Sequence, residues 1–330
     1  MAHSYTPGLR ITESTVLRRE RRLPLRGTVL AAVGDLVDAE QVVARCDLPG
    51  NVQTINLASR LSLDPARVPN SLVVALGAPV RAGDVIAASR AMFGLMKTTV
   101  RAPLDGTIEG VSHVTGQLIF REPLIPVEVT AYVAGRVAEV LPAEGVIIEA
   151  SGAFLQGIFG VGGETWGEIV VAVNGPADDL NASDLRAEHR GKVVVGGSYV
   201  SYEALMRARE LEVAAVVVGG FDDRSLRQLL GRDLGVAITG AEEFGLTLIL
   251  TEGFGRIRMA DRAWSLLGKF SGSRAAVSGA TQIRAGVMRP EILIPHAAVA
   301  GASDASGDGG LELGSVVRAI REPHFGRIGR

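Results

Sequence analysis

The spacing of apolar residues changes near Pro176, and this change limits what the chain can fold into. Before it, short apolar runs such as Gly145–Ala150 end at Gly, Pro or Asp, which is typical of β-strands. After it, continuous apolar runs such as Val213–Val218 alternate with amphipathic segments such as Ser201–Leu211. Strands that are apolar on both faces are buried on both, so this alternation predicts a parallel sheet covered by helices. The chain is therefore predicted to combine all-β and α/β parts.

Composition excludes several classes of protein. The 330 residues include 41 glycines and one cysteine, and 47% are hydrophobic, which is ordinary for a folded chain. One cysteine excludes a disulfide framework and a Cys-built zinc site. Cys46 follows Val42–Arg45 on an expected strand, and we expect it to be a structural thiol. The net charge of −2 does not favour binding to nucleic acid or membranes. Without an apolar signal region near the N-terminus, we expect a cytoplasmic protein.

The β-rich half contains an internal repeat. Val33–Ala44 and Leu76–Ala87 share one pattern: an apolar residue, Gly, two residues, Val, one residue, Ala, two residues, Val, an apolar residue and Ala. The pattern predicts a glycine turn, a second turn and a buried strand. We expect two hairpin-like copies as pseudo-symmetric halves of one small β unit, packed face to face.

The second copy continues into Val100–Ile108, which contains Ala-Pro-x-x-Gly-x-Ile. Together these motifs resemble the barrel-sandwich hybrid superfamily, which includes biotinyl and lipoyl carrier domains and barrels of electron-transport subunits and bacterial RNA polymerase. The resemblance covers roughly 25–135 and implies a fold rather than a function. Carriers modify a Lys that precedes the Ala-Pro pair by about seven residues, whereas Lys97 precedes Ala102 by five. We therefore expect Lys97 to be unmodified.

A glycine-rich stretch, Gly157–Glu168, allows two interpretations. Its backbone amides could cradle a phosphate. A dinucleotide fingerprint requires a helix after the loop, however, and here an apolar strand follows. We expect a turn or bulge that joins two strands.

Ligands of parallel sheets bind beyond the carboxyl ends of the strands, where this chain has three glycine-bearing turns. Amides at such turns and forked arginine donors suit an anion. The alternative is that the glycines only make tight turns. The candidate ligand-binding residues are Gly196, Gly197, Ser198, Gly219, Gly220, Asp222, Glu252, Gly253, Gly255, Arg256, Arg284 and Arg289.

The C-terminal stretch Gly314–Arg330 resembles the opening of a KOW-type or SH3-like strand pair. Such modules occur in ribosomal and transcription-elongation proteins, where they contact RNA or protein. The expected organisation is a flexible leader at 1–24, a barrel-sandwich-hybrid-like β domain at 25–175, a doubly wound α/β domain at 189–298, a linker at 299–313 and a partial KOW-like segment at 314–330. The polar stretch Ala177–Glu188 would link the two domains.

The five histidines are scattered without metal-ligand spacing, and no catalytic motif stands out. We expect a non-catalytic binding or assembly protein with no metal and no cofactor, whose partners are a small anionic ligand at the α/β rim or another protein. One alternative is an enzyme that acts on a phosphorylated or carboxylate metabolite through Arg256, Arg284 or Arg289. Another is a transcription- or translation-associated factor that uses the KOW-like end, although few aromatic residues are present for stacking on bases.

Overall fold

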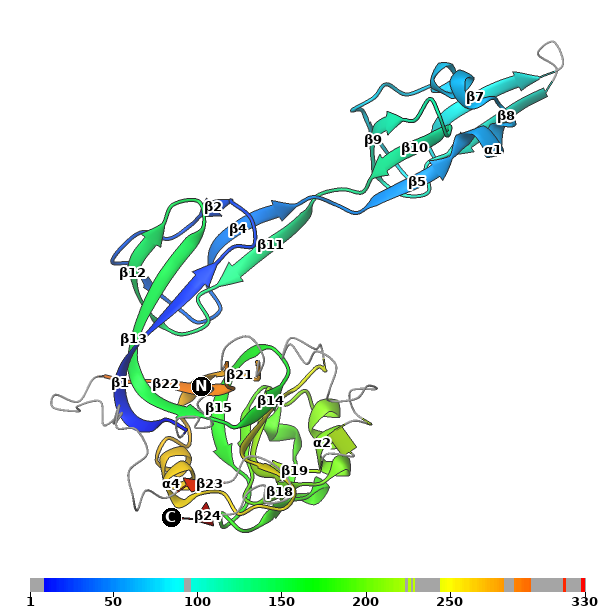
Figure 1. The fold of residues 1–330 in the computed structure, drawn as a ribbon. Helices are drawn as coiled ribbons and strands as arrows, with labels where there is room; N and C mark the ends of the chain where they lie inside the picture. Colours follow the sequence, from blue (N-terminus) through cyan, green and yellow to red (C-terminus); the bar gives the residue numbers. More distant parts are fainter. Residues whose placement is uncertain are drawn as a thin grey trace.

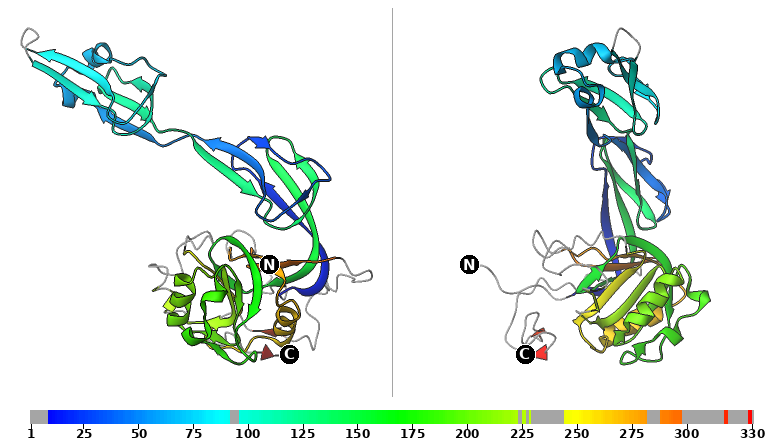
Figure 2. Two further views of the ribbon diagram at one scale, coloured as in Figure 1. Left: turned by 180° about the vertical axis from the view of Figure 1, so that it is seen from behind. Right: turned by 90° about the vertical axis from the view of Figure 1, so that its right-hand side faces the viewer.

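The computed structural model describes residues 9–91, 96–222, 225–226, 228, 244–281, 288–297, 317–318 and 328–329. Its strands far outnumber its helices. Figure 1 shows a rounded body from which a narrow arm rises, and Figure 2 shows the arm from behind and from the side. We call residues 151–297 the body, 23–50 with 123–150 the proximal unit, and 51–122 the distal unit. The two units form the arm.

The body is built on four parallel strands in the order β20-β19-β17-β15, with antiparallel β14 and β21 beside them. Alternate residues along these strands join two separate apolar clusters, so the sheet is buried on both faces. Helix α2 packs on one face and α4 on the other. The body strands are β14 (Phe159–Val161), β15 (Glu164–Val171), β16 (Asp179–Leu180), β17 (Val193–Val195), β18 (Tyr199–Val200), β19 (Ala215–Phe221), β20 (Thr247–Phe254), β21 (Arg274–Ser278) and β22 (Glu291–Pro295). The helical elements are η3 (Ala182–Asp184), η4 (Ala187–His189), α2 (Tyr202–Glu210) and α4 (Asp261–Lys269).

Individual helices and strands predicted in the body are confirmed. Ser201 is the N-cap of α2, and its hydroxyl accepts a hydrogen bond from the backbone N–H of Ala204. The apolar runs near 193, 215 and 247 form the buried parallel strands. The expected helix at 259–267 is α4, shifted by two residues.

Two long strands connect the body to the arm. β1 (Ile11–Arg22) and β13 (Gly145–Gln156) pair antiparallel over their whole length, and β13 continues the body sheet through β22. The predicted flexible leader at 1–24 is therefore wrong for 11–22. Its arginines are partnered: Arg19 binds Glu291 with 2.6 Å between Nη2 and Oε2, and Arg21 binds Glu164 with the same separation.

The expected domain boundary at 175 is also wrong. β14 pairs with β20 and β15 pairs with β17, so both strands belong to the α/β sheet rather than to a β domain that ends after them. The stretch expected as a linker, Ala177–Glu188, holds β16, which pairs with β18, and its Leu180 is fully buried. The sequence pattern grouped β14 and β15 with the strands that precede them, whereas they pair with β20 and β17, which lie later in the chain.

The arm holds two units with the same strand plan. In the proximal unit, one sheet contains β13, β12 and β3 in that order, and a second sheet contains β11, β4 and β2. Its strands are β2 (Thr28–Val29), β3 (Leu36–Val37), β4 (Val42–Leu48), β11 (Ile125–Thr130) and β12 (Gly135–Leu141). In the distal unit, β5, β10, β9 and β6 form one sheet, and the β7–β8 hairpin the other. Its elements are β5 (Val52–Asn56), α1 (Leu57–Leu61), η1 (Pro65–Ser71), β6 (Pro79–Val80), β7 (Val85–Ala91), β8 (Met96–Arg101), β9 (Gly106–Val111) and β10 (Gln117–Arg121).

Several backbone hydrogen bonds join corresponding residues in the two units. The N–H of Gly34 donates to the carbonyl of Val137, and the N–H of Gly77 donates to that of Ile108, both at 2.8 Å. Val29 pairs with Ala44 just as Leu72 pairs with Ala87. The repeat seen in the sequence thus lies in two separate units, not in two halves of one unit as expected. The distal unit occupies the end of the β4–β11 hairpin, so one copy is inserted into the other.

The C-terminal prediction is described only in small part. Val317–Arg318 (β23) pairs antiparallel with Ile328–Gly329 (β24). The rest of the KOW-like segment and the linker at 299–313 lie outside the described residues. Across the part of the chain that the structure describes, no helix is both long and apolar enough to cross a membrane.

Candidate functional site

The predicted ligand rim lies at the carboxyl ends of β17, β19 and β20. Neighbouring atoms, mostly backbone, occupy the space where its glycines would carry a side chain. A Cβ at Gly197 would overlap the carbonyl of Asp178, one at Gly219 that of Ile257, and one at Gly220 that of Gly255. A Cβ at Gly196 would lie 2.8 Å from side-chain carbons of Leu180 and Val218. These glycines are therefore required by close packing of two loops over the rim, the alternative that the sequence left open.

The polar side chains of the rim bind one another. The hydroxyl of Ser198, which is buried, donates to Oδ1 of Asp179 at 2.8 Å. Oδ2 of the same carboxylate forms an ion pair with Arg256, whose guanidinium lies 5.0 Å from the centre of the Tyr199 ring. Sequence reasoning missed Asp179 because it falls in the stretch interpreted as a linker. An incoming anion would have to displace this carboxylate from Arg256.

Two further acidic candidates serve helix starts. Glu252 is buried, and its Oε1 accepts the backbone N–H of Ala260 at 2.9 Å, where α4 begins without a side-chain cap of its own. Asp222 accepts the N–H of Ser225 at 2.9 Å. Burial raises the pKa of Tyr199, and the carboxylates of Asp222 and Glu203 raise it further.

The four remaining candidates are Gly253, Gly255, Arg284 and Arg289. Gly253, near the end of β20, and Gly255, directly after it, have φ values of 142° and 99°, which glycine tolerates, and their carbonyls lie against Gly220. Arg289 is half-buried, and burial lowers its pKa; it precedes Pro290, which packs against Gly160 of β14. Arg284 lies outside the described residues.

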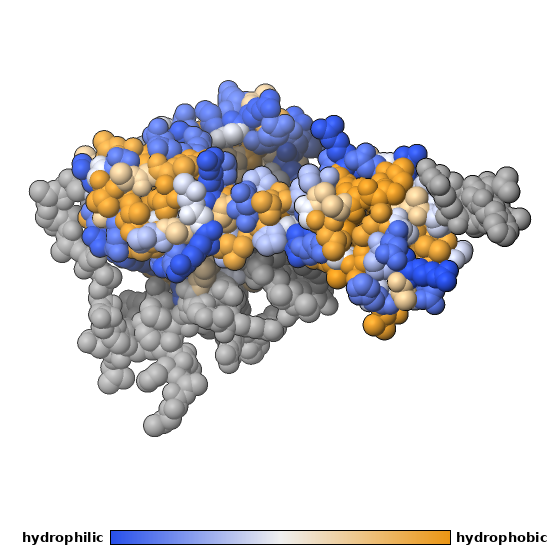
Figure 3. Space-filling view, turned by 90° about the horizontal axis from the view of Figure 1, so that it is seen from above, coloured by the Kyte–Doolittle hydropathy of each residue, from blue (hydrophilic) through white to orange (hydrophobic). Residues whose placement is uncertain are grey.

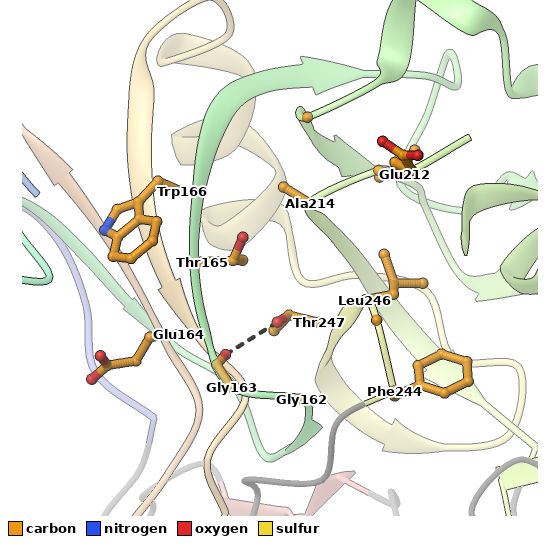
Figure 4. Close-up of a pocket in the computed structure, with 13 residues that line it drawn as sticks. Gly162, Gly163, Glu164, Thr165, Trp166, Glu212, Ala214, Phe244, Leu246 and Thr247 are labelled. Carbon is orange, nitrogen blue, oxygen red and sulfur yellow. Dashed lines mark hydrogen bonds between the residues drawn. The ribbon is translucent and has the colours of Figure 1, made fainter. Parts of the chain in front are cut away.

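A groove of about 610 Å³ lies at the opposite edge of the sheet, where β15, β19 and β20 begin. In Figure 4, Thr165, Leu246 and Thr247 face the groove, whereas Trp166 and Glu164 lie on the other side of β15. The hydroxyl of Thr247 donates to the carbonyl of Gly163 at 3.1 Å. Among the described residues that line this groove, Glu212 carries a carboxylate and none is basic, so the groove does not suit an anion.

The glycine-rich stretch forms one wall of this groove. β14 ends at Val161, Gly162 turns with a φ of 92°, and β15 begins at Glu164. The prediction of a turn between two strands is confirmed. The buried residue Thr281 binds β14, because its hydroxyl accepts the N–H of Gly160 at 2.8 Å.

The other chemistry-bearing residues are not brought together. Within the described ranges, no three His, Cys, Asp or Glu side chains form a group that could hold a metal ion. Cys46 is a buried free thiol. Lys97 lies on β8, but its side chain is outside what the structure describes.

Searches with this chain found no matching family model, no matching curated protein and no matching solved structure.

Proposed function

We propose that this chain is a binding or assembly protein that contacts its partners through the arm. One observation carries the proposal: both units of the arm expose apolar side chains at equivalent positions. Leu30 and Val33 of the proximal unit are 48% and 64% exposed, and their counterparts Val73 and Leu76 are 56% and 58% exposed. Single exposed apolar residues are common, but apolar surface gathered on a protruding element marks interaction sites.

The surface view supports this proposal. Figure 3 looks down on the arm and shows one apolar area over the distal unit and another over the proximal unit, with more polar surface around them. The expectation that both units are barrel-sandwich hybrids is part of the same proposal, because their two small sheets and matched turns fit that resemblance. The resemblance implies a fold that presents turns and hairpins to partners, and it assigns no reaction.

Site-specific photo-cross-linking tests the proposal. A photoreactive phenylalanine analogue would replace Leu76 of the distal unit, Leu36 of the proximal unit or, as a control, Met288 of the body, all of which are exposed. In cells that make the protein, we expect light-dependent adducts to a polypeptide at Leu76 and Leu36 and none at Met288. Equal adduct formation at all three positions, or none on the arm, would refute an arm-based contact.

A further inference from the structure

Tyr132 lies at the joint between arm and body in two unfavourable circumstances. Its φ of 68° places the backbone in the left-handed region, which bulky side chains disfavour. Its side chain is buried, and its hydroxyl has no hydrogen-bond partner within the part of the chain that the structure describes. A buried polar group without a partner destabilises the state that buries it. We call the orientation of the arm described above the docked state; both features of Tyr132 oppose it.

The distal unit contains the same turn without a buried tyrosine. Pro103 corresponds to Tyr132: in each unit the preceding alanine, Ala131 or Ala102, donates its N–H to the carbonyl of the facing turn, at 2.9 Å and 2.8 Å. The glycine three residues later pairs with a valine at the same place in both copies of the repeat. A proline ring holds φ at about −65°. Pro103 is exposed, whereas Tyr132 is buried. The turn itself therefore does not require a positive φ at this position.

Contacts with the body hold Tyr132 in its conformation. Nε1 of Trp166 in β15 donates to the carbonyl of Tyr132 at 2.6 Å. The guanidinium of Arg21 lies 5.3 Å from the centre of the Tyr132 ring and binds the carboxylate of Glu164. Nε of the same arginine donates to the carbonyl of Thr130 in the arm at 2.8 Å. These contacts offset the unfavourable backbone and the unpaired hydroxyl only while the arm is docked.

We propose that the joint is a two-state latch on which the arm swings. In the docked state, Trp166 holds the carbonyl of Tyr132, and φ is positive. In the released state this hydrogen bond is broken, Tyr132 takes the negative φ of its counterpart Pro103, and its hydroxyl binds water. The β1–β13 ribbon connects body and arm in both states. The latch acts whatever the arm contacts, so it goes beyond the proposed function.

Double electron–electron resonance on the full-length chain tests the latch. Spin labels are attached at Glu128→Cys in β11 and Glu210→Cys in α2, both exposed positions, after the native Cys46 is changed to Ala. The measured quantity is the ratio of released to docked distance populations. Trp166→Phe removes the donor to the Tyr132 carbonyl and should raise this ratio about fivefold. Trp264→Phe in α4 is the matched control and should leave the ratio unchanged.

Two changes at Tyr132 itself should move the ratio in opposite directions. Tyr132→Pro imposes the φ of Pro103 and should make the released state dominant. Tyr132→Phe, made in the Trp166→Phe chain, removes the unpaired hydroxyl and should lower the ratio again about fivefold, since only the docked state gains. Tyr202→Phe in the same chain is its control and should have no effect.

Thermal unfolding shows which variants remain folded, and the two phenylalanine variants decide the question even if the proline variant does not fold. A merely structural role of Tyr132 and Trp166 would lower melting temperatures and leave the distance distribution as it is. A single distance that is the same in the native chain and in Trp166→Phe overturns the latch. A rise of the released population in the Tyr132→Phe chain overturns the role of the hydroxyl and with it the proposal.

Discussion

At the scale of single residues, the rim glycines show most clearly why tertiary contacts decide a role. Gly163 and Gly220 both follow or sit within apolar strands in the sequence, yet only Gly220 has backbone against the position of its missing Cβ. A sequence motif cannot separate these cases, because the overlapping atoms belong to Gly253 and Gly255, far along the chain.

Gly220→Ala should lower the free energy of unfolding by about 2 kcal/mol or more, because its Cβ would meet the carbonyl of Gly255. Urea unfolding of the purified chain measures this change. Gly163→Ala is the matched control, since nothing lies within 4 Å of the Cβ it would add, and it should change stability by less than about 0.5 kcal/mol. Equal effects of the two changes would contradict the packing explanation.

His189 gives a pH prediction. It is buried, and its Nδ1 accepts the N–H of Arg186 at 3.3 Å. Burial lowers its pKa; the carboxylate of Glu188 opposes this shift, and Lys192 and Arg186 add to it. Because the folded pKa is below the unfolded value, the unfolded state binds the proton first as pH falls. Its contribution to stability is therefore complete above the unfolded pKa and is lost as pH drops through that value towards the folded pKa.

The measurement compares the free energy of unfolding at neutral and mildly acidic pH for the native chain and His189→Gln, which retains a hydrogen-bond acceptor. We expect the acid-induced loss of stability to be smaller in the variant. An identical pH dependence in both chains would show that His189 does not titrate as described.

At the scale of elements, the arm is a hairpin whose end has been extended by a second copy of itself. Leu48 and Ile125 are the last paired residues of β4 and β11, and the chain between them carries the whole distal unit. The proximal and distal cores are separate apolar clusters. Each unit thus has its own source of stability.

Replacing residues 49–124 by Asn-Gly should leave the body and the proximal unit folded, because a two-residue turn can connect directly paired strands. Thermal unfolding followed by circular dichroism should show a cooperative transition at a temperature close to that of a transition of the native chain. Loss of that transition would mean that the distal unit is needed for folding of the rest.

Side chains of the body and of β1 form contacts across the joint between arm and body. Nε1 of Trp166 in β15 donates to the carbonyl of Tyr132 at 2.6 Å, and Arg21 lies over the Tyr132 ring while it binds Glu164. Tyr132 is buried with a φ of 68°, and burial raises its pKa well above the usual range. Arg19 and Arg21, which lie in the stretch expected to be a flexible leader, thus bind carboxylates of the body.

At the scale of the whole molecule, the arm makes the chain far from spherical (Figure 2). A compact chain of 330 residues would have a radius of gyration of about 20 Å. Small-angle scattering at low chain concentration should give a clearly larger value, and the 49–124 replacement should bring it down. A value near that of a sphere for the native chain would show that the arm folds back on the body.

What the sequence determined by itself was local. Strand and helix types in the body, the cap at Ser201, the turn at Gly162 and the repeat at 33–44 and 76–87 follow from short-range periodicity and turn chemistry. Only the tertiary structure decided which strands pair, and hence that β1 is no leader, that β14 and β15 belong to the body, and that the repeat makes two units. Pairing depends on hydrogen bonds and burial between residues distant in the chain, and a single sequence does not record those contacts.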